Sequence, residues 1–221
     1  MKIDPKRITK FDRTQAELEW FLLFCISTAG KNAEVQARKI NEMVDYILNS
    51  YLTSPRGPKG IYGFSDGCAD WLVQFSKCFG IGKYTILRES ANHIYENSLR
   101  YKLDSITLEE LLEIPGVGNK TARFFLMHSR PGFEGAVIDT HIHGWLEKVC
   151  QTDLPKPTTD AKYRSLERLW LSMTEVFFPG LPLHVADLAT WILMRTWPQY
   201  DPYHSEWDSC VKTAINQAQL A

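Results

Sequence analysis

The chain has 221 residues, of which 44% are hydrophobic and 12% aromatic, and its formal net charge is −1. This composition is typical of a globular chain with a core, and it excludes an intrinsically disordered protein. The near-neutral charge argues weakly against a nucleic-acid binder, so local basic clusters are more informative than the sum. Two such clusters occur, one at the start of the chain (Lys2, Lys6, Arg7, Lys10 and Arg13) and one in the acid-free stretch 116–132. Either cluster taken alone is more often a solvated face.

No apolar run reaches the roughly 20 residues that cross a bilayer, and the N-terminus lacks the apolar segment of a signal peptide. We therefore expect an intracellular protein that does not enter a membrane. The five cysteines are scattered, and none has the close spacing of zinc or iron–sulfur ligands. The sequence thus predicts reduced thiols and no bound metal.

Apolar residues recur with helical spacing along almost the whole chain, and no pair of segments alternates as strands do. The predicted helices are, in chain order, 15–28, 33–52, 66–79, 83–97, 108–113, 119–129, 140–150, 161–177, 183–196 and about 205–218. A loop rich in Pro and Gly is predicted at 53–63. The expected fold class is all-α.

The segment 111–122, LLEIPGVGNKTA, predicts two helices joined by a tight hairpin. Pro115 ends the first helix, and Gly116 and Gly118 permit positive φ angles or a close backbone approach. Bare amides at such a hairpin and at the next helix start are suited to holding a phosphate. An ordinary helix connection is the alternative for any Pro-Gly turn, but PGVG followed closely by lysine is more specific.

Lys120 is predicted in the first turn of the second helix, where the helix dipole disfavours a positive charge. Most lysines in such places are solvated surface groups. If Lys120 instead faces a cleft, the dipole and desolvation both favour the neutral amine. A neutral amine is a nucleophile that forms a Schiff base with a sugar C1′.

Asp139 follows the apolar run 136–138 and precedes a predicted helix, so one role for it is that of an N-cap. A second role is compatible with the first. If one carboxylate oxygen caps the helix, the other can accept the lysine proton. It can also stabilise positive charge on a sugar during base departure.

Together, LLEIPGVGNKTA and the later AVIDTHI (136–142) resemble the hairpin and aspartate of the helix-hairpin-helix DNA glycosylase superfamily. Lys120 and Asp139 match the superfamily's catalytic positions, and the lysine is that of its bifunctional branch, which includes endonuclease III and 8-oxoguanine DNA glycosylases. The resemblance implies a single all-α glycosylase domain over 1–221, made of two lobes with the active-site cleft between them. One lobe is expected at about 32–131, the other at 1–31 plus 132–221.

Endonuclease III usually has four closely spaced C-terminal cysteines that hold an iron–sulfur cluster, whereas only Cys210 lies near the C-terminus here. We therefore expect neither a cluster nor an organic cofactor. FCISTA (24–29) and ARFFL (122–126) are similar to segments of small helical 8-oxoguanine glycosylases. The resemblance implies a monomer in the cytoplasm or nucleoid that removes 8-oxoguanine from damaged double-stranded DNA. The alternatives are an oxidised-pyrimidine glycosylase like endonuclease III, an enzyme of related fold that processes other unusual bases, and a helix-hairpin-helix module that binds DNA without cutting it.

The same resemblance implies further DNA contacts. The hairpin contacts are expected from Gly116, Val117, Gly118 and Asn119, with Arg123 nearby. Lys31 and Asn32, in the turn 29–32, are expected to contact DNA in the gap left by the extruded base, although helix capping by Gly30 and Asn32 is the competing interpretation. His128, His141 and His143 form no established metal-ligand motif. Trp145, Trp191 and Trp197 are either core aromatics or a stacking surface for a flipped base.

Overall fold

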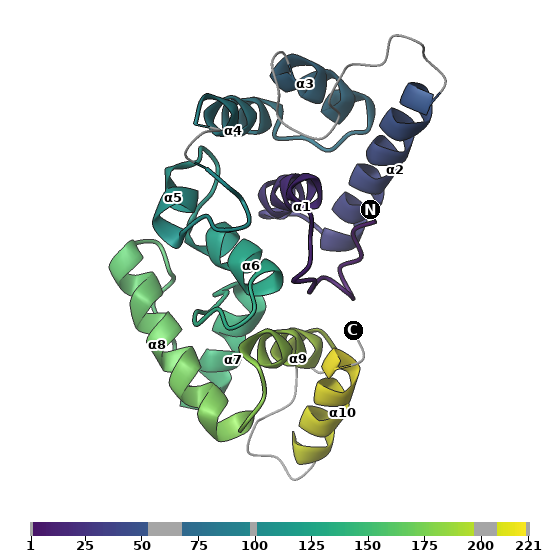
Figure 1. Ribbon diagram of the computed structural model, residues 1–221. Coiled ribbons are helices and arrows are strands. Elements are labelled where there is room, and N and C mark those ends of the chain that lie inside the picture. Colours follow the sequence, from purple (N-terminus) through teal and green to yellow (C-terminus); the bar gives the residue numbers. More distant parts are fainter. Residues whose placement is uncertain (1, 53–67, 98–100, 197–206, 220–221) are drawn as a thin grey trace. The chain divides into compact units, whose positions relative to one another are not determined.

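The computed structural model describes residues 2–52, 68–97, 101–196 and 207–219. Within these ranges all regular structure is helical, which confirms the all-α prediction for the described residues. The helices are α1 (Gln15–Thr28), α2 (Ala33–Leu52), α3 (Cys68–Cys78), α4 (Tyr84–Glu96), α5 (Leu108–Glu113), α6 (Asn119–Ser129), α7 (Thr140–Cys150), α8 (Asp160–Phe177), α9 (Leu183–Thr196) and α10 (Trp207–Gln219) (Figure 1).

Most helices have the bounds that the sequence predicts. Helix α8 begins one residue early, at Asp160, because the Thr159 hydroxyl caps it by accepting a hydrogen bond from the Lys162 amide at 3.3 Å. Helix α4 begins one residue late, at Tyr84, because Lys83 adopts a left-handed conformation. The predicted loop 53–63 and the predicted helix starts at Asp66 and Ser205 lie outside the described residues.

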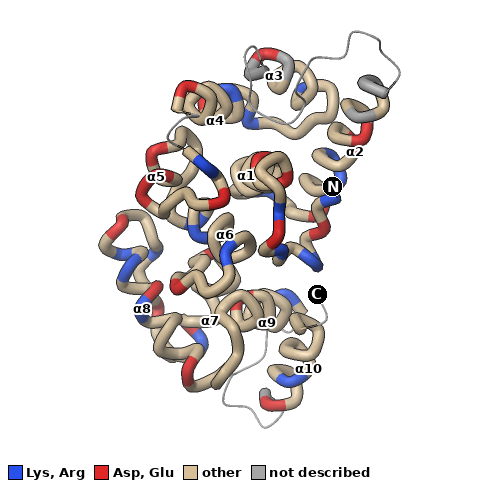
Figure 2. The backbone as a smooth tube through the Cα atoms, in the orientation of Figure 1, with Lys and Arg blue, Asp and Glu red and all other residues tan. Residues whose placement is uncertain are grey.

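The chain divides into two compact units, Met1–Phe125 and Leu126–Ala221, and the boundary falls inside α6. Basic and acidic residues are interspersed along both units (Figure 2). The expected grouping of 1–31 with 132–221 stays a prediction.

The core of the first unit is built around α1, which is apolar on nearly every side, as is typical of an enclosed helix. Phe21, Phe24 and Ile26 of α1 are buried, and both α2 and α4 pack against the helix. Phe21 also stacks on Phe125 of α6, with ring centroids 5.6 Å apart. Each such side chain stabilises the fold by roughly 1.5–3 kcal/mol through burial, so α1 positions α6.

An ordered arm precedes α1 in the first unit. Ile3 and Ile8 are buried, and the Asn41 side-chain amide pairs with both the amide and the carbonyl of Ile3 at 2.8 Å each. Arg13 donates to the Ile8 carbonyl, and its guanidinium lies 3.9 Å from the centroid of the Phe21 ring. These contacts hold the arm so that its basic side chains Lys2, Lys6, Arg7 and Lys10 are exposed.

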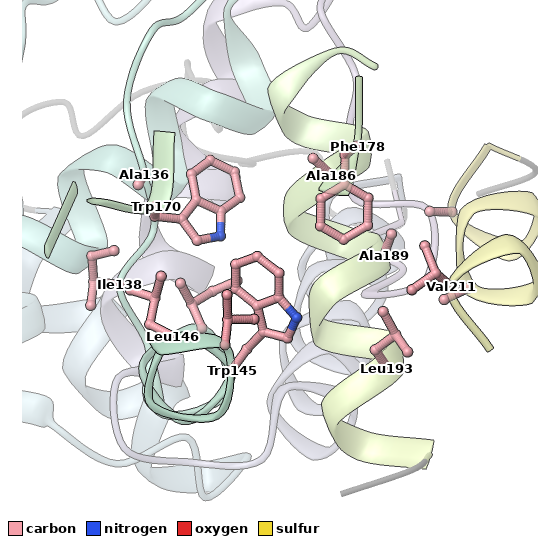
Figure 3. Close-up of a cluster of buried hydrophobic side chains, with 14 of the residues drawn as sticks. Ala136, Ile138, Trp145, Leu146, Trp170, Phe178, Ala186, Ala189, Leu193 and Val211 are labelled. Atoms are coloured by element: carbon pink, nitrogen blue, oxygen red, sulfur yellow. The ribbon is translucent and has the colours of Figure 1, made fainter. Parts of the chain in front are cut away.

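The second unit has its own core, centred on Trp145 and Trp170, which are fully buried with Phe178 nearby (Figure 3). Helix α7 packs against α8 and α9, and α9 packs against α10. Of the two roles that the sequence leaves open for Trp145, the structure shows that of a core aromatic. Trp191 is half-buried, and Trp197 lies outside the described residues.

Candidate active site

The predicted hairpin lies between α5 and α6. Thr107 begins α5 with a capping box, in which its hydroxyl accepts from the Glu110 amide at 3.2 Å. After α5, the Val117 amide donates to the Ile114 carbonyl at 3.0 Å and closes a four-residue turn. Pro115 is the second residue of this turn, and Gly116, with a φ of 80°, is the third. A proline and a positive-φ glycine at these two positions are the features of a type II turn. The turn brings the chain directly to the start of α6.

Helix α4 braces this turn. The side chain of Ile86 lies so close to Gly116 that a β-carbon has no room there. The hydroxyl oxygen of Ser90 is 2.6 Å from the Pro115 carbonyl oxygen, to which it can donate. Gly116 is thus required both by its positive φ and by its contact with α4. Gly118, by contrast, has open space where a β-carbon would stand.

Lys120 is exposed in the first turn of α6. Among the described residues none forms a hydrogen bond or an ion pair with its Nζ, and none accepts from the amides of Gly118, Asn119 or Lys120. Unpaired amides are expected at the start of a helix. The Val117 amide is already used by the turn. An anion at this hairpin therefore meets the amides that follow Val117, together with one ammonium group.

Arg123 lies one turn further along α6. It is buried, and its Nη1 donates to the Asn119 side-chain oxygen at 2.6 Å. The pair braces the first turn of the helix, because the side chains of Arg123 and Asn119 bind each other across one helical turn. Direct contact of either residue with DNA stays a prediction.

A second lysine beside the hairpin, Lys83, was missed by sequence reasoning. It precedes α4 with φ 56° and ψ 34°, in the left-handed region that non-glycine residues seldom occupy. Its Nζ donates to the Ile26 carbonyl near the end of α1 at 3.1 Å. Desolvation, followed by the charges of Lys31 and Lys120, lowers the pKa of Lys83. In the sequence, Lys83 shares one feature with Lys120, since each is a lysine at a helix start.

The turn after α1 has the predicted caps. Gly30 has a φ of 74°, and the Asn32 side chain accepts from the Val35 amide at 3.0 Å, which caps the start of α2. The capping interpretation is confirmed for both residues. Lys31 is exposed, and its Nζ donates to the Ile81 carbonyl in the loop before α4 at 2.8 Å. Contacts of Lys31 and Asn32 with DNA stay predictions.

Asp139 in the second unit is the N-cap of α7, as predicted. Its Oδ1 accepts from the amides of His141 and Ile142 at 2.8 and 2.9 Å. Among the described residues nothing donates to Oδ2. Helix capping therefore occupies one carboxylate oxygen of Asp139 and leaves the other able to accept a proton. Lys120 belongs to the first unit and Asp139 to the second, so their pairing stays a prediction.

The extended segment that leads into Asp139 is held by α8. The Tyr163 hydroxyl accepts from the Ile138 amide and donates to the Ala136 carbonyl, each at 2.9 Å. Glu167 accepts from the Ala136 amide at 3.0 Å. Tyr163 is fully buried. The backbone immediately before Asp139 is therefore held through both amide and carbonyl groups, which limits how far Asp139 can move.

The histidines form no metal site among the described residues, where no group of three or more metal-ligating side chains occurs. His128 is buried with its Nε2 3.9 Å from an Asp187 carboxylate oxygen. His141 meets the half-buried Trp191 ring edge-on at 5.9 Å, and His143 lies 3.5 Å from Glu147 on its own helix. Each histidine thus has a local packing partner.

Comparison of the chain with protein-family models, with curated proteins and with solved structures found no match. Within the described ranges, no helix is both long enough and apolar enough to cross a membrane.

Proposed function

We propose that this protein is a DNA glycosylase of the helix-hairpin-helix type that also cleaves the strand at the abasic site. The observation that carries the proposal is the hairpin itself, in which a type II turn is followed at once by amides and by an exposed Lys120 that have no partner among the described residues. A binder of phosphate needs the amides. An enzyme that forms a Schiff base needs, in addition, an amine that no carboxylate neutralises. The two-lobed arrangement with the active site in a cleft is part of this proposal.

In this mechanism the neutral amine of Lys120 attacks C1′ of a nucleotide that has been flipped out of the duplex. The C1′–N bond breaks, and the base leaves with the electron pair. The Oδ2 of Asp139, which accepts from none of the described residues, takes the proton released by the amine and stabilises positive charge on the sugar. The lysine nitrogen then expels O4′, which takes the proton back from Asp139, so that the sugar ring opens and a Schiff base forms between Lys120 and C1′. Loss of a C2′ proton from this Schiff base breaks the C3′–O bond by β-elimination.

The amides of Gly118, Asn119 and Lys120 hold a DNA phosphate without reading sequence. Lys31 and Asn32 add contacts from the turn after α1, and Arg123 supports the same surface by bracing Asn119. No step requires a metal or an organic cofactor. The partner is damaged double-stranded DNA, and the protein acts as an intracellular monomer.

The proposed substrate is 8-oxoguanine, and the competing substrate is an oxidised pyrimidine such as thymine glycol. An amine nucleophile assisted by a carboxylate suits 8-oxoguanine, because guanine-derived bases leave slowly without protonation. Single-turnover assays on duplexes that carry one lesion each test this choice. We expect 8-oxoguanine to be released fastest. Faster release of thymine glycol overturns the substrate but not the mechanism, whereas release of neither base and no strand cleavage overturns the proposed function.

A helix-hairpin-helix module that binds DNA without cutting it is the second candidate. It is favoured by the exposure of Lys120, since an exposed lysine beside free amides also suits a simple phosphate contact. The discriminating reaction is borohydride reduction in the presence of a duplex with an abasic site. A binder gives no covalent adduct, while a Schiff-base enzyme is trapped on the DNA.

A further inference from the structure

Three lysines from different parts of the first unit gather beside the hairpin. Lys31 follows α1, Lys83 precedes α4, and Lys120 lies in the first turn of α6. The charges of Lys31 and Lys120 both act on Lys83. The carbonyl that binds Lys83 belongs to Ile26, whose side chain lies 3.6 Å from where a β-carbon of Gly116 would stand. Lys83 is therefore anchored next to the turn that presents Lys120.

The charges that act on Lys83 within the described part of the chain are both cationic. No acid is among the described groups that act on its charge. From α1 the titratable group near Lys120 is Cys25, and burial raises the pKa of its thiol, so the thiol is neutral. From α2, Lys39 donates to the Gly80 carbonyl in the loop before α4 at 2.6 Å. Partial burial among like charges favours the neutral amine of Lys83, and a neutral amine accepts protons.

We propose that Lys83 is the base that removes the C2′ proton during strand scission, after Lys120 has formed the Schiff base. This inference rests on the proposed function. It assigns the two chemical steps to two lysines that converge from α4 and α6, with Lys120 as nucleophile and Lys83 as proton acceptor.

The step balances without a further reagent. The iminium between Lys120 and C1′ makes the C2′ proton acidic, and the amine nitrogen of Lys83 takes that proton. The C2′–H electron pair forms the C2′–C3′ double bond. The C3′–O bond breaks, and its electron pair leaves with the phosphate of the downstream strand. Lys83 then returns the proton to solvent.

A cationic Lys83 that only attracts phosphate is the competing role, and arginine separates the two. The guanidinium of a Lys83→Arg variant keeps the positive charge but stays protonated at any working pH. Arginine at position 83 can therefore still bind a phosphate but cannot act as a base. Lys83→Gln removes both charge and base. Lys39→Gln is the matched control, because Lys39 binds the same loop through a backbone carbonyl but does not act on the charge of Lys83.

The experiment uses the full chain and a duplex with one abasic site, which avoids dependence on the lesion. The rate of borohydride trapping reports Schiff-base formation, and the rate of strand cleavage reports elimination. We expect Lys83→Gln and Lys83→Arg each to lower the ratio of cleavage to trapping about a hundredfold, the usual range for loss of a general base. We also expect wild-type cleavage to rise with pH until Lys83 is neutral, a rise that both variants lose. Lys39→Gln keeps the wild-type ratio, and thermal unfolding checks that each variant is folded.

A ratio in Lys83→Gln within about threefold of the wild-type ratio overturns the inference, since a general base contributes far more than that. Restoration of cleavage by Lys83→Arg overturns it too, because the role is then electrostatic. An equal fall in trapping and cleavage assigns Lys83 a merely structural role. If the wild type itself gives no trapped adduct, the proposed function fails and this inference fails with it. If the wild type gives the trapped adduct and Lys83→Gln has the same ratio of cleavage to trapping, this inference fails but the proposed function stands.

Discussion

At the scale of single residues, Asp139 uses its two carboxylate oxygens differently. Oδ1 caps α7, and Oδ2 has no donor among the described residues. We expect Asp139→Asn to keep the cap, because asparagine caps helices as well as aspartate does, yet to lower base release about a hundredfold or more for lack of a proton acceptor. Asp139→Ala loses activity and, in addition, about 1 kcal/mol of unfolding free energy.

Single-turnover kinetics and thermal unfolding of the two Asp139 variants separate these effects. Wild-type activity in Asp139→Asn shows that the carboxylate takes no proton. A large loss of stability in Asp139→Asn shows instead that the charge, and not only the cap, holds α7.

Glu19 on α1 gives a pH-dependent prediction. Burial raises its pKa to about 6, against the opposing hydrogen bond from Gln15. The folded state therefore binds this proton more tightly than the unfolded state does. The ionised Glu19 carboxylate lowers the free energy of unfolding, and this effect reaches its full size above about pH 6 and vanishes well below the unfolded pKa of 4.5. We expect Glu19→Gln to raise the free energy of unfolding by about 1–2 kcal/mol at pH 8 and to leave it unchanged at pH 4. Denaturant unfolding at both pH values measures this, and an equal effect at both contradicts the assignment.

The two lysines beside the hairpin show what local sequence can reveal about a residue. Lys120 was predictable because its neighbours PGVG specify both the turn and the helix that follows. Lys83 also stands at a helix start, but its place beside the hairpin was not predictable, because its anchor is the Ile26 carbonyl, 57 residues earlier in the chain. Its left-handed backbone likewise depends on packing that cannot be predicted from the neighbouring residues in the sequence.

At the scale of elements, Gly116 and Gly118 differ although both belong to the same hairpin. We expect Gly116→Ala to lower the free energy of unfolding by about 2 kcal/mol or more, from its positive φ and the contact with Ile86. Gly118→Ala has room for its methyl group and should change stability by less than about 1 kcal/mol. That methyl group stands where the phosphate approaches, so binding should weaken about tenfold for all DNA sequences alike.

Thermal unfolding and equilibrium binding to duplexes of several sequences test this pair. Gly116→Ala serves as the folding-defective comparison, and binding in Gly118→Ala reports the phosphate contact alone. Unchanged binding by a well-folded Gly118→Ala variant, or loss confined to one lesion, contradicts the role of the hairpin amides.

The helices were predictable because most of their boundaries are local. Thr14 and Thr107 form capping boxes with a residue three positions later, and Asp139 caps within its own turn. Periodicity then places the apolar side chains. What the sequence did not predict is which helices pack together, such as α4 against the Gly116 turn or α8 against the segment before Asp139. Those contacts join positions 25 or more residues apart in the chain and arise only in the folded core.

At the scale of the whole molecule, the proposed activity requires residues from both compact units. Lys120 and Lys83 lie in the first unit and Asp139 in the second. The net charge of −1 offers little long-range attraction to DNA, so the proposed DNA binding depends on local groups such as the hairpin amides and the exposed basic side chains of the N-terminal arm. Function in this account belongs to the complete chain and not to either unit alone.

The central claim is that Lys120 forms a covalent bond with the sugar. The most direct measurement is borohydride reduction with a duplex that carries an abasic site, followed by proteolysis and mass spectrometry of the cross-linked peptide. We predict an adduct on Lys120 in the wild type and none in Lys120→Gln, whose thermal unfolding matches the wild type because the exposed side chain has no partner in the described part of the chain. An adduct on a different lysine, or an undiminished adduct in Lys120→Gln, contradicts the claim.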